Sequence, residues 1–360
     1  MTAEDRVLCL AARTSVEADD ERRLVQLLRP PLDWERLWAE AARHEVLPLV
    51  GATLRRLGER AAPPAGWAAR VERQRYATLL RNTGLADALV EVTSAFEDSG
   101  VESLAVKGVA LASAVYGDLA LRPAADLDVV VRPADLPAAR SVLRSLGFDH
   151  RSDSPGDEWA HSHHDEPYFR SSAGGEVCLE LHWALWPAAR FRADGGMWER
   201  ARPLELRGAT LRTLAPEDTL LHLAVHRTRA PVRLRSLCDV AELVRRDGSE
   251  LDWETVETRG AAIGARTALF SVLSLSERLL AAPVPPGILA RLGVGPLRRR
   301  ILEPASGTGA LFGPTASGPI RRQLRTGLRA FEHDGVPAIA RALARRAAQK
   351  GDRLLAATTP

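Results

Sequence analysis

The sequence predicts an α+β protein, in which a small mixed sheet with helices is flanked by helical segments at both ends. Three observations predict this class. A short apolar strand, a glycine turn and a helix follow one another over residues 104–115. A second apolar strand, 127–131, is introduced by Asp126-Leu127-Asp128, and a hairpin pattern follows at 167–181. Outside 101–212, apolar residues recur at helical spacing instead.

Residues 1–100 are predicted to form a helical segment that packs on the core. Asp33 is an expected N-cap, because its side chain can accept a hydrogen bond from the first turn that follows. The stretch Pro63-Pro64-Ala65-Gly66 is an expected linker. A long helix then runs from about residue 67 to residue 98, and Gly100 ends it.

Residues 101–212 are predicted to form the α/β core. The strand at 104–106 leads through the turn and a helix to the strand at 127–131, and a further helix covers about 136–146. The hairpin at 167–181 turns over Ser172-Ala173-Gly174-Gly175. A last hairpin, 204–211, turns at Arg207-Gly208.

The remainder of the chain is predicted to be helical with one interruption. Residues 213–302 carry helical patterns and form a C-terminal helical domain. Residues 303–319 are rich in Gly, Pro, Ser and Thr, which predicts a flexible loop. Residues 320–360 are rich in arginine and predict a helical tail.

Composition indicates an ordinary globular protein, with 46% hydrophobic and 26% charged residues and a net charge of +3. No arginine block is dense enough to indicate a nucleic-acid-binding tail. Cys9, Cys178 and Cys238 are odd in number and widely spaced, which favours a reducing compartment. The N-terminus does not resemble a signal peptide, and no run is long enough to span a membrane. We therefore expect a cytoplasmic protein.

Asp126 and Asp128 are the predicted metal ligands. Alternate residues of a strand share a face, so both carboxylates point the same way. Paired carboxylates repel each other unless a cation lies between them, and Mg²⁺ prefers such oxygen ligands. The alternative is a pair of solvent-facing aspartates that cap the turn before Pro133.

Lys107 and Gly108 are the predicted phosphate-binding turn. A glycine turn that opens a helix presents backbone N–H groups to an anion, and the ammonium adds a charge beside them. Lys107 is notable because the only other lysine is Lys350. Arg122 is a candidate to clamp a phosphate through two N–H groups; the alternative is a salt bridge to Asp118.

This ordered set of motifs resembles the nucleotidyltransferase superfamily of the DNA polymerase β type. Within it, the sequence resembles a bacterial group known as uncharacterised nucleotidyltransferases, over roughly residues 34–283. In chain order the motifs are Lys107-Gly108, Tyr116-Gly117-Asp118, Arg122-Pro123, Asp126-Leu127-Asp128 and Leu179-Glu180-Leu181-His182-Trp183. One departure is the turn, which is usually Gly-Ser or Gly-Gly in the superfamily and here is Lys107-Gly108-Val109.

Glu180 is the candidate third carboxylate. Strand alternation places Cys178, Glu180 and His182 on one face, and His182 is a candidate to contact phosphate or orient Glu180. The alternative is an exposed edge strand. The resemblance implies that the third acid binds a metal and accepts the proton of the attacking hydroxyl. It also implies two Mg²⁺ ions, held by Asp126, Asp128 and Glu180.

Other histidines leave alternatives open. His161, His163 and His164 belong to a polar loop whose spacing is not that of a closed zinc site, so the loop is either a contact to an anionic substrate or simply solvated. His222 and His226 share a helix face, but the glutamate of a zinc-protease H-E-x-x-H motif is missing.

The leading hypothesis is nucleotidyl transfer from an NTP to a hydroxyl, with release of pyrophosphate. A small molecule or a peptide is the expected acceptor, because the chain has few aromatic residues and a nearly neutral charge, which disfavours a nucleic acid. The alternatives are a tRNA-modifying, toxin-like nucleotidyltransferase and a non-catalytic nucleotide sensor or scaffold. The sequence does not fix the oligomeric state.

Overall fold

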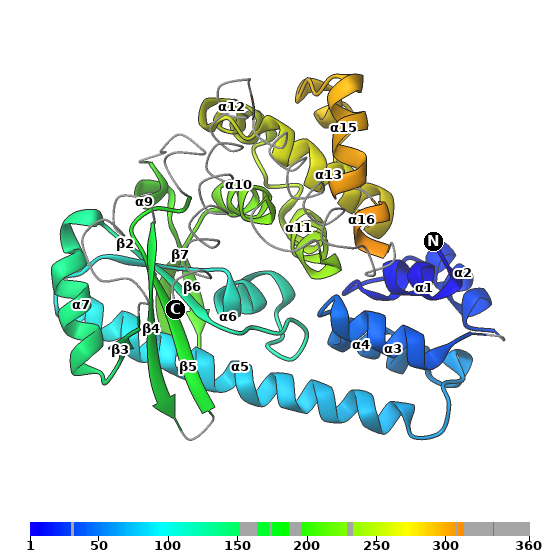
Figure 1. Cartoon of the computed structure of the whole chain (residues 1–360), viewed down its shortest axis with the longest axis horizontal. Helices are drawn as coiled ribbons and strands as arrows, with labels where there is room; N and C mark the ends of the chain where they lie inside the picture. The colour runs from blue at the N-terminus through cyan, green and yellow to red at the C-terminus, as the bar shows by residue number, and fades with distance from the viewer. Residues whose placement is uncertain are drawn as a thin grey trace, which may run out of the picture.

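The structure, a computed structural model, describes residues 1–29, 32–151, 164–172, 175–186, 196–228, 233–306, 308–312 and 334. Over these residues the protein has the predicted α+β class, with one seven-stranded sheet in the order β3-β4-β5-β2-β1-β7-β6 (Figure 1). The strands are β1 (Ser103–Val106), β2 (Leu127–Val131), β3 (Asp149–His150), β4 (Asp165–Ser172), β5 (Gly175–His182), β6 (Arg202–Leu206) and β7 (Ala209–Thr213).

The centre of the sheet is mixed. Strand β2 pairs antiparallel with β1 and parallel with β5, and β1 pairs parallel with β7. The two predicted hairpins are β4–β5 and β6–β7, both antiparallel. The motif-bearing strands β1, β2 and β5 are therefore three consecutive strands in the middle of the sheet.

Each face of the sheet is covered by a different set of helices. Leu127, Val129 and Val131 of β2 lie in one hydrophobic cluster with residues of α5 (Trp67–Asp98) and α7 (Leu136–Ser145). Val130 of β2, together with Leu104 of β1, belongs to a second cluster that contains the C-terminal helices. Alternation along β2 therefore turns Asp128, like Val130, toward the C-terminal helices.

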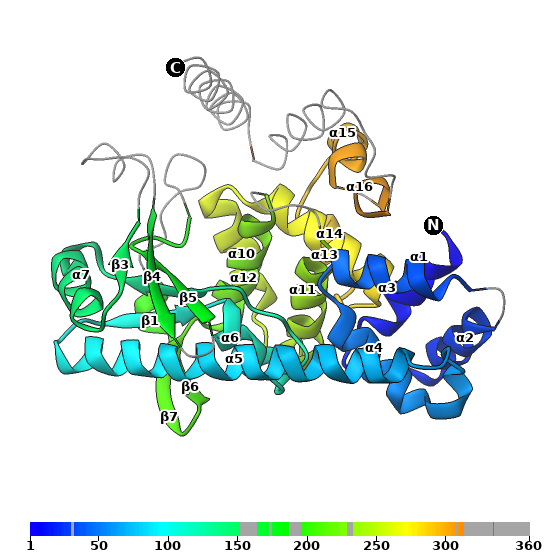
Figure 2. The ribbon, with the colours of Figure 1, turned by 60° about the horizontal axis from the view of Figure 1, so that its bottom comes forward.

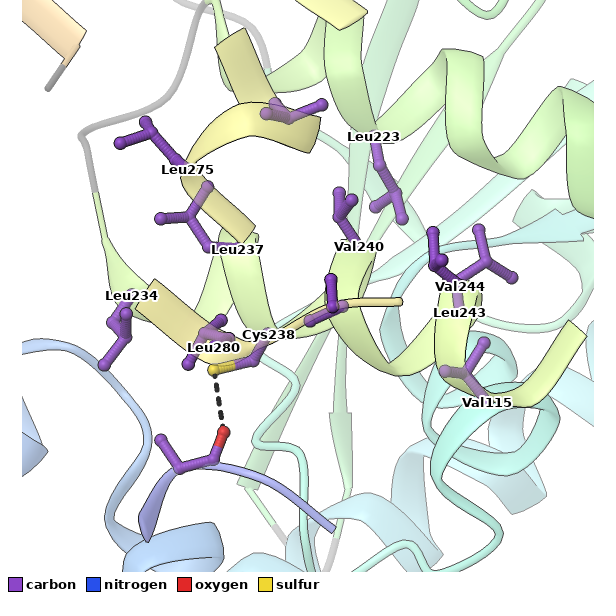
Figure 3. Close-up of a cluster of buried hydrophobic side chains, with 14 of the residues drawn as sticks. Val115, Leu223, Leu234, Leu237, Cys238, Val240, Leu243, Val244, Leu275 and Leu280 are labelled. Atoms are coloured by element: carbon purple, nitrogen blue, oxygen red, sulfur yellow. Dashed lines mark hydrogen bonds between the residues drawn. The ribbon is translucent and has the colours of Figure 1, made fainter. Parts of the chain in front are cut away.

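The C-terminal helices form the second half of the protein. They are α10 (Pro216–Arg227), α11 (Leu234–Asp247), α12 (Trp253–Ile263), α13 (Arg266–Leu280) and α14 (Ile288–Arg291). Apolar residues of α11 lie at the centre of their core, beside Leu223 of α10 and Leu280 of α13 (Figure 3). These five helices all lie within residues 213–302.

The first hundred residues do not pack on the sheet as one segment. Their short helices are α1 (Ala3–Ala11), α2 (Ala18–Leu28), α3 (Trp34–Arg43), α4 (Leu47–Leu57) and η1 (Gly58–Ala61). These helices share a hydrophobic cluster with α10, α11 and α13. The Cys238 thiol of α11 donates to the carbonyl of Ala12 at 3.3 Å (Figure 3). Helix α1 packs against α13 and helix α4 packs against α5, so the segment does not meet the rest of the protein as a single unit.

Helix α5 connects the two halves. It runs along one side of the molecule from the N-terminal helices to the sheet (Figure 2). At its start, Trp67 makes edge-on contacts with Trp34 and Trp38, at 5.3 and 6.0 Å between ring centroids. Near its end, Val92 and Phe96 are buried in the cluster beneath the sheet. Helix α5 contacts β1 and β7, so this last helix of the N-terminal segment packs on the sheet.

The predicted flexible loop at 303–319 is helical where it is described. Helices α15 (Pro296–Ser306) and α16 (Thr308–Phe312) extend into it. Leu311 is buried, and the Phe312 ring lies 5.3 Å from that of His44. These two apolar residues anchor a segment that its glycine and proline content predicted to be a loop. The rest of that segment and the predicted tail at 320–360 lie outside the described residues, apart from Asp334.

None of the helices in the described part of the chain is both long and apolar enough to cross a membrane.

Candidate active site

Asp128 and Glu180 lie directly side by side on neighbouring strands. The parallel register of β2 and β5 pairs Asp128 with Glu180, and Val130 with His182. Nε2 of His182 lies 3.1 Å from Oδ1 of Asp128 and 3.4 Å from Oε2 of Glu180. One ligand atom from each of these three residues falls within 4.8 Å of the other two. The structure thus brings the predicted third carboxylate and His182 to the Asp-x-Asp strand.

Lys107 reaches the same cluster from β1. Val106 is the register partner of Asp128, so the next residue of β1 lies at the edge where the carboxylates gather. The ammonium Nζ is 2.5 Å from Oδ1 of Asp128. Lys107 was predicted to bind phosphate; in the structure, which holds no nucleotide, its ammonium forms an ion pair with Asp128.

Gly108 is held close to the strand that carries the aspartates. Its φ is +41°, and a Cβ added there would lie 2.9 Å from the backbone oxygen of Asp126. It begins α6 (Gly108–Leu111), which continues into the π-helical turn η2 (Ala112–Tyr116). Both the left-handed backbone and the close approach require glycine at this position.

Asp126 stands next to the cluster without being one of its three closest members. It shares the face of Asp128 by strand alternation, and it is half-buried. Burial, followed by the negative charges of Asp128 and Glu180, raises the pKa of the Asp126 carboxyl. The three predicted acids are therefore near enough to repel one another.

In the site, burial and the neighbouring charged groups shift the pKa values of Asp128 and His182 in opposite directions. Burial by itself raises the pKa of the Asp128 carboxyl, but Lys107 and a hydrogen bond from His182 outweigh burial and hold it well below its usual range. Burial likewise lowers the pKa of His182, and its hydrogen bonds to Asp128 and Glu180 raise it to about 9. Asp128 is thus ionised, and His182 carries a proton at neutral pH.

Arg122 pairs with Asp239 and not with Asp118, the alternative partner that was predicted for it. Its buried guanidinium binds both carboxylate oxygens of Asp239 in α11, and Nη1 donates to the carbonyl of Gly108 at 3.0 Å. Asp118, the alternative partner, pairs with Arg75 at 3.5 Å. Arg122 therefore supports the Gly108 turn. Its Nε, Nη1 and Nη2 groups all donate to protein oxygens. Asp239 supports the site through this contact with Arg122, which the sequence did not predict.

Residues 30–281 match a family model described as uncharacterised nucleotidyltransferase. The chain belongs to this family. The match extends from before α3 to the end of α13 and includes the whole sheet with Asp126, Asp128 and Glu180. The resemblance seen in the motifs is thereby confirmed, and the protein is a nucleotidyltransferase.

Two solved structures are similar to this nucleotidyltransferase. The antibiotic-resistance factor ANT(2'')-Ia has 14% identity and a TM-score of 0.35, covering 50% of this chain and 91% of that protein. An antigenic nucleotidyltransferase-like protein from Paracoccidioides brasiliensis has 15% identity and a TM-score of 0.39, covering 57% and 95%. No curated protein matches the sequence.

The oxygen-rich site of the nucleotidyltransferase fits a divalent cation. Three carboxylates face one another, and the pKa of Asp126 is raised in part by the other two. A cation between them would relieve this repulsion, and carboxylate oxygens are the ligands that Mg²⁺ prefers. Asp128 and Glu180 are the two acids whose oxygens already lie close together.

The predicted histidine loop contributes one described residue to the site. His161 and His163 lie outside the described residues. His164 is buried, with its ring centroid 5.6 Å from that of His182. Together with Asp165 it forms a second close group that includes His182. Strand pairing explains this placement, because Asp165 is the register partner of His182.

A pocket of about 380 Å³ adjoins the site on the side of Lys107. It lies between η2, the β6–β7 hairpin and helices α10 and α11, and His222 is part of its wall. His222 is buried, and neither ring nitrogen has a hydrogen-bond partner among the described residues. Its neighbour His226 stacks on it, with 6.1 Å between ring centroids.

Proposed function

We propose that the protein is a Mg²⁺-dependent nucleotidyltransferase that moves an NMP from an NTP to a hydroxyl of a small molecule or peptide. The observation that carries this proposal is the register of β2 and β5, which sets Asp128 beside Glu180 at the edge where Lys107 and Gly108 follow β1. Family membership supports the reaction class. The site residues and the acceptor class are the parts that we add.

Each residue of the cluster has a distinct task in this proposal. Asp126, Asp128 and Glu180 hold the metal, and the Gly108 turn and Lys107 bind the triphosphate. When bound, Mg²⁺ supplies positive charge at the phosphate oxygens and lowers the pKa of a coordinated hydroxyl. His182 fixes the orientation of Asp128 and Glu180 through its contacts at 3.1 and 3.4 Å.

The reaction is an in-line displacement at the α-phosphorus. The acceptor oxygen forms a bond to the α-phosphorus, and the bond from that phosphorus to the oxygen bridging to the β-phosphate breaks. Glu180 takes the proton of the attacking hydroxyl, since its side chain is 34% exposed and thus more accessible than those of Asp128 and His182. Pyrophosphate leaves with the bond electrons. Positioning and electrostatic stabilisation supply most of the rate.

The test is pyrophosphate release with Mg²⁺ and each NTP, with and without a metabolite extract. Asp128→Ala is compared with Asp87→Ala, which removes an exposed aspartate from an ion pair with Arg207. We expect release that needs the extract, is lost in Asp128→Ala and in Asp126→Ala, and persists in Asp87→Ala. Mass shifts in the extract then identify the acceptor.

Other outcomes would point to the alternatives. Retained turnover in Asp126→Ala or Asp128→Ala would contradict the site assignment. Tight NTP binding with no release from any extract would favour a nucleotide sensor. Release that depends on added tRNA would favour the toxin-like alternative, and modified tRNA would be seen by mass.

A further inference from the structure

Asp126 differs from the other two acids of the site in how its backbone is held. The register of the sheet pairs Asp128 with Glu180, and the pairing of β2 with β5 begins at Leu127 and Leu179. Asp126 comes one residue before β2 and belongs to none of the strand pairs in the described part of the chain. Contacts outside the sheet must therefore fix its carboxylate beside the other two.

The loop that leads to Asp126 is held by a buried asparagine of helix α5. The side-chain amide of Asn82 donates to the carbonyl of Leu119 at 2.6 Å and to that of Arg122 at 2.7 Å. Its Oδ1 accepts a hydrogen bond from the backbone N–H of Ala124 at 3.2 Å. Asn82 is fully buried, and both ends of its amide are used. This side chain therefore fixes the course of the loop up to two residues before Asp126.

Arg81, the neighbour of this asparagine, holds the last residue of the loop. Its Nη2 donates to the carbonyl of Ala125 and its Nη1 to the carbonyl of Glu176 on β5, each at 3.0 Å. Both carbonyls precede the point where the pairing of β2 with β5 begins. The guanidinium thus joins the two chains just before the sheet does. Hydrogen bonds from such a charged donor are stronger than those between neutral groups.

We propose that Arg81 is a positioning residue for Asp126, which it holds at the metal site by tying Ala125 to β5. The inference rests on the proposed function, because Asp126 is a metal ligand only in that proposal. Residues that orient a metal ligand without touching the metal commonly change metal affinity by roughly 10–100-fold. Helix α5, which packs on the sheet, would then also order the metal site.

The charge of Arg81 and its hydrogen bonds have opposite effects on a bound cation. Loss of a positive charge near the site favours binding of a divalent cation, because like charges repel each other. Loss of the two hydrogen bonds frees the backbone before Asp126 and disfavours binding. The direction of the change in metal affinity therefore separates a positioning residue from a nearby charge.

The experiment measures the Kd of Mn²⁺, used in place of Mg²⁺, from the electron paramagnetic resonance signal of the free ion. The full chain is titrated as wild type, as Arg81→Met, which removes the charge and both hydrogen bonds, and as Arg81→Lys, which keeps the charge on a single nitrogen. Arg207→Met is the matched control, because it removes an arginine that also contacts helix α5, through an exposed ion pair with Asp87.

We expect Mn²⁺ to bind about tenfold or more weakly to Arg81→Met, with an intermediate Kd for Arg81→Lys and an unchanged Kd for Arg207→Met. In the background of Asp126→Asn, Arg81→Met is expected to cause no further loss, because a residue that acts only through Asp126 has nothing left to position. An unchanged or tighter Kd in Arg81→Met would overturn the proposal, and so would a full further loss in the double variant. A wild type that binds no Mn²⁺ would overturn it as well.

Stability and turnover are measured separately. If urea unfolding showed a loss of stability in Arg81→Met while the Kd stayed unchanged, Arg81 would support only the fold, and the proposal would be wrong. A wild type that shows the expected Mn²⁺ binding, yet releases no pyrophosphate with any NTP, would remove the proposed reaction and leave the role of Arg81 in place. Turnover by the wild type with an unchanged Kd in Arg81→Met would do the reverse.

Discussion

The guanidinium of Arg122 donates two hydrogen bonds to the carboxylate of Asp239, from Nε to Oδ1 at 2.8 Å and from Nη2 to Oδ2 at 3.0 Å. Both side chains are buried. The hydroxyl of Tyr116 donates to the same carboxylate at 2.7 Å, and Nη1 of Arg122 donates to the carbonyl of Gly108. This network joins the turn beside the candidate active site to helix α11.

Asp239→Ala is predicted to be strongly destabilising. Removing one partner of a buried ion pair leaves the other charge without compensation, which costs about 3–5 kcal/mol. The free energy of unfolding from urea titration is the measurement. Asp87→Ala, which breaks an exposed pair with Arg207, is the control and is expected to cost under about 1 kcal/mol. Equal losses in the two variants would contradict the network. The double variant Arg122→Met/Asp239→Leu is expected to recover part of the loss.

Gly108→Ala is predicted to damage both stability and nucleotide binding. A Cβ at this position would lie 2.9 Å from the carbonyl oxygen of Asp126, and the φ of +41° is unfavourable for alanine. Gly117→Ala is a matched control, because Gly117 has a φ of +66° and a Cβ there would meet no atom within 4 Å. We expect about 1–2 kcal/mol of loss in the control, from the left-handed backbone alone.

The difference between the two glycine variants isolates the close approach to Asp126. Gly108→Ala is expected to lose more stability than Gly117→Ala in thermal unfolding, and it alone is expected to weaken binding of an NTP analogue. If the two variants behaved alike in both measurements, the contact between Gly108 and Asp126 would have no consequence for the site.

The contrast between Glu180 and Arg122 shows what the sequence could predict. Strand alternation alone places Glu180 and His182 on one face of their strand. The order of the motifs then indicates that this face lies near the Asp-x-Asp strand. In the structure the register of β2 and β5 pairs Asp128 with Glu180. Arg122 has its partner 117 residues away on a helix, and no local pattern encodes that contact. The sequence shows that Arg122 is charged, but it does not show which residue its guanidinium binds.

The same limit explains the N-terminal helices. Leu24 and Leu28 are buried, as their helical spacing predicts. Periodicity tells which face of a helix is apolar, but it does not tell which other element covers that face. In the structure α1 packs against α13, and Ala12, just after α1, accepts a hydrogen bond from Cys238, which lies 226 residues later in the chain.

The buried His44 is predicted to make stability depend on pH. Its Nδ1 accepts a hydrogen bond from the backbone N–H of Leu234 at 3.0 Å. Burial, together with the nearby charges of Arg43 and Arg233, lowers the pKa of His44 from 6.5 to about 3. The unfolded chain therefore binds a proton below pH 6.5 that the folded chain does not bind until about pH 3.

Stability is therefore expected to fall as the pH drops from 6.5 toward 3, by up to about 1.4 kcal/mol per pH unit from this residue. His44→Asn keeps an acceptor oxygen near the position of Nδ1 but does not titrate. Urea midpoints of the wild type and of this variant, measured between pH 7 and pH 4, give the contribution as the difference in slope. Parallel curves would show that His44 is not protected from protonation in the folded state.

His222→Leu is predicted to leave stability unchanged or to raise it by about 1 kcal/mol. Both ring nitrogens of His222 are buried without a hydrogen-bond partner among the described residues. Burial, followed by the nearby charges of Lys107 and His226, lowers the pKa of His222, so the ring is neutral. An unsatisfied buried polar group costs about 1–3 kcal/mol, whereas a leucine of similar size has no polar atoms to satisfy.

His44→Leu is the matched control, since it removes a buried imidazole that does have a partner and leaves the N–H of Leu234 unpaired. That variant is expected to lose about 1–3 kcal/mol. Thermal and urea unfolding of the two variants at pH 7.5 give the comparison. A loss in His222→Leu as large as in His44→Leu would show that the ring nitrogens of His222 do have partners. Such partners would lie in the adjoining pocket of about 380 Å³, as ordered water or as bound substrate.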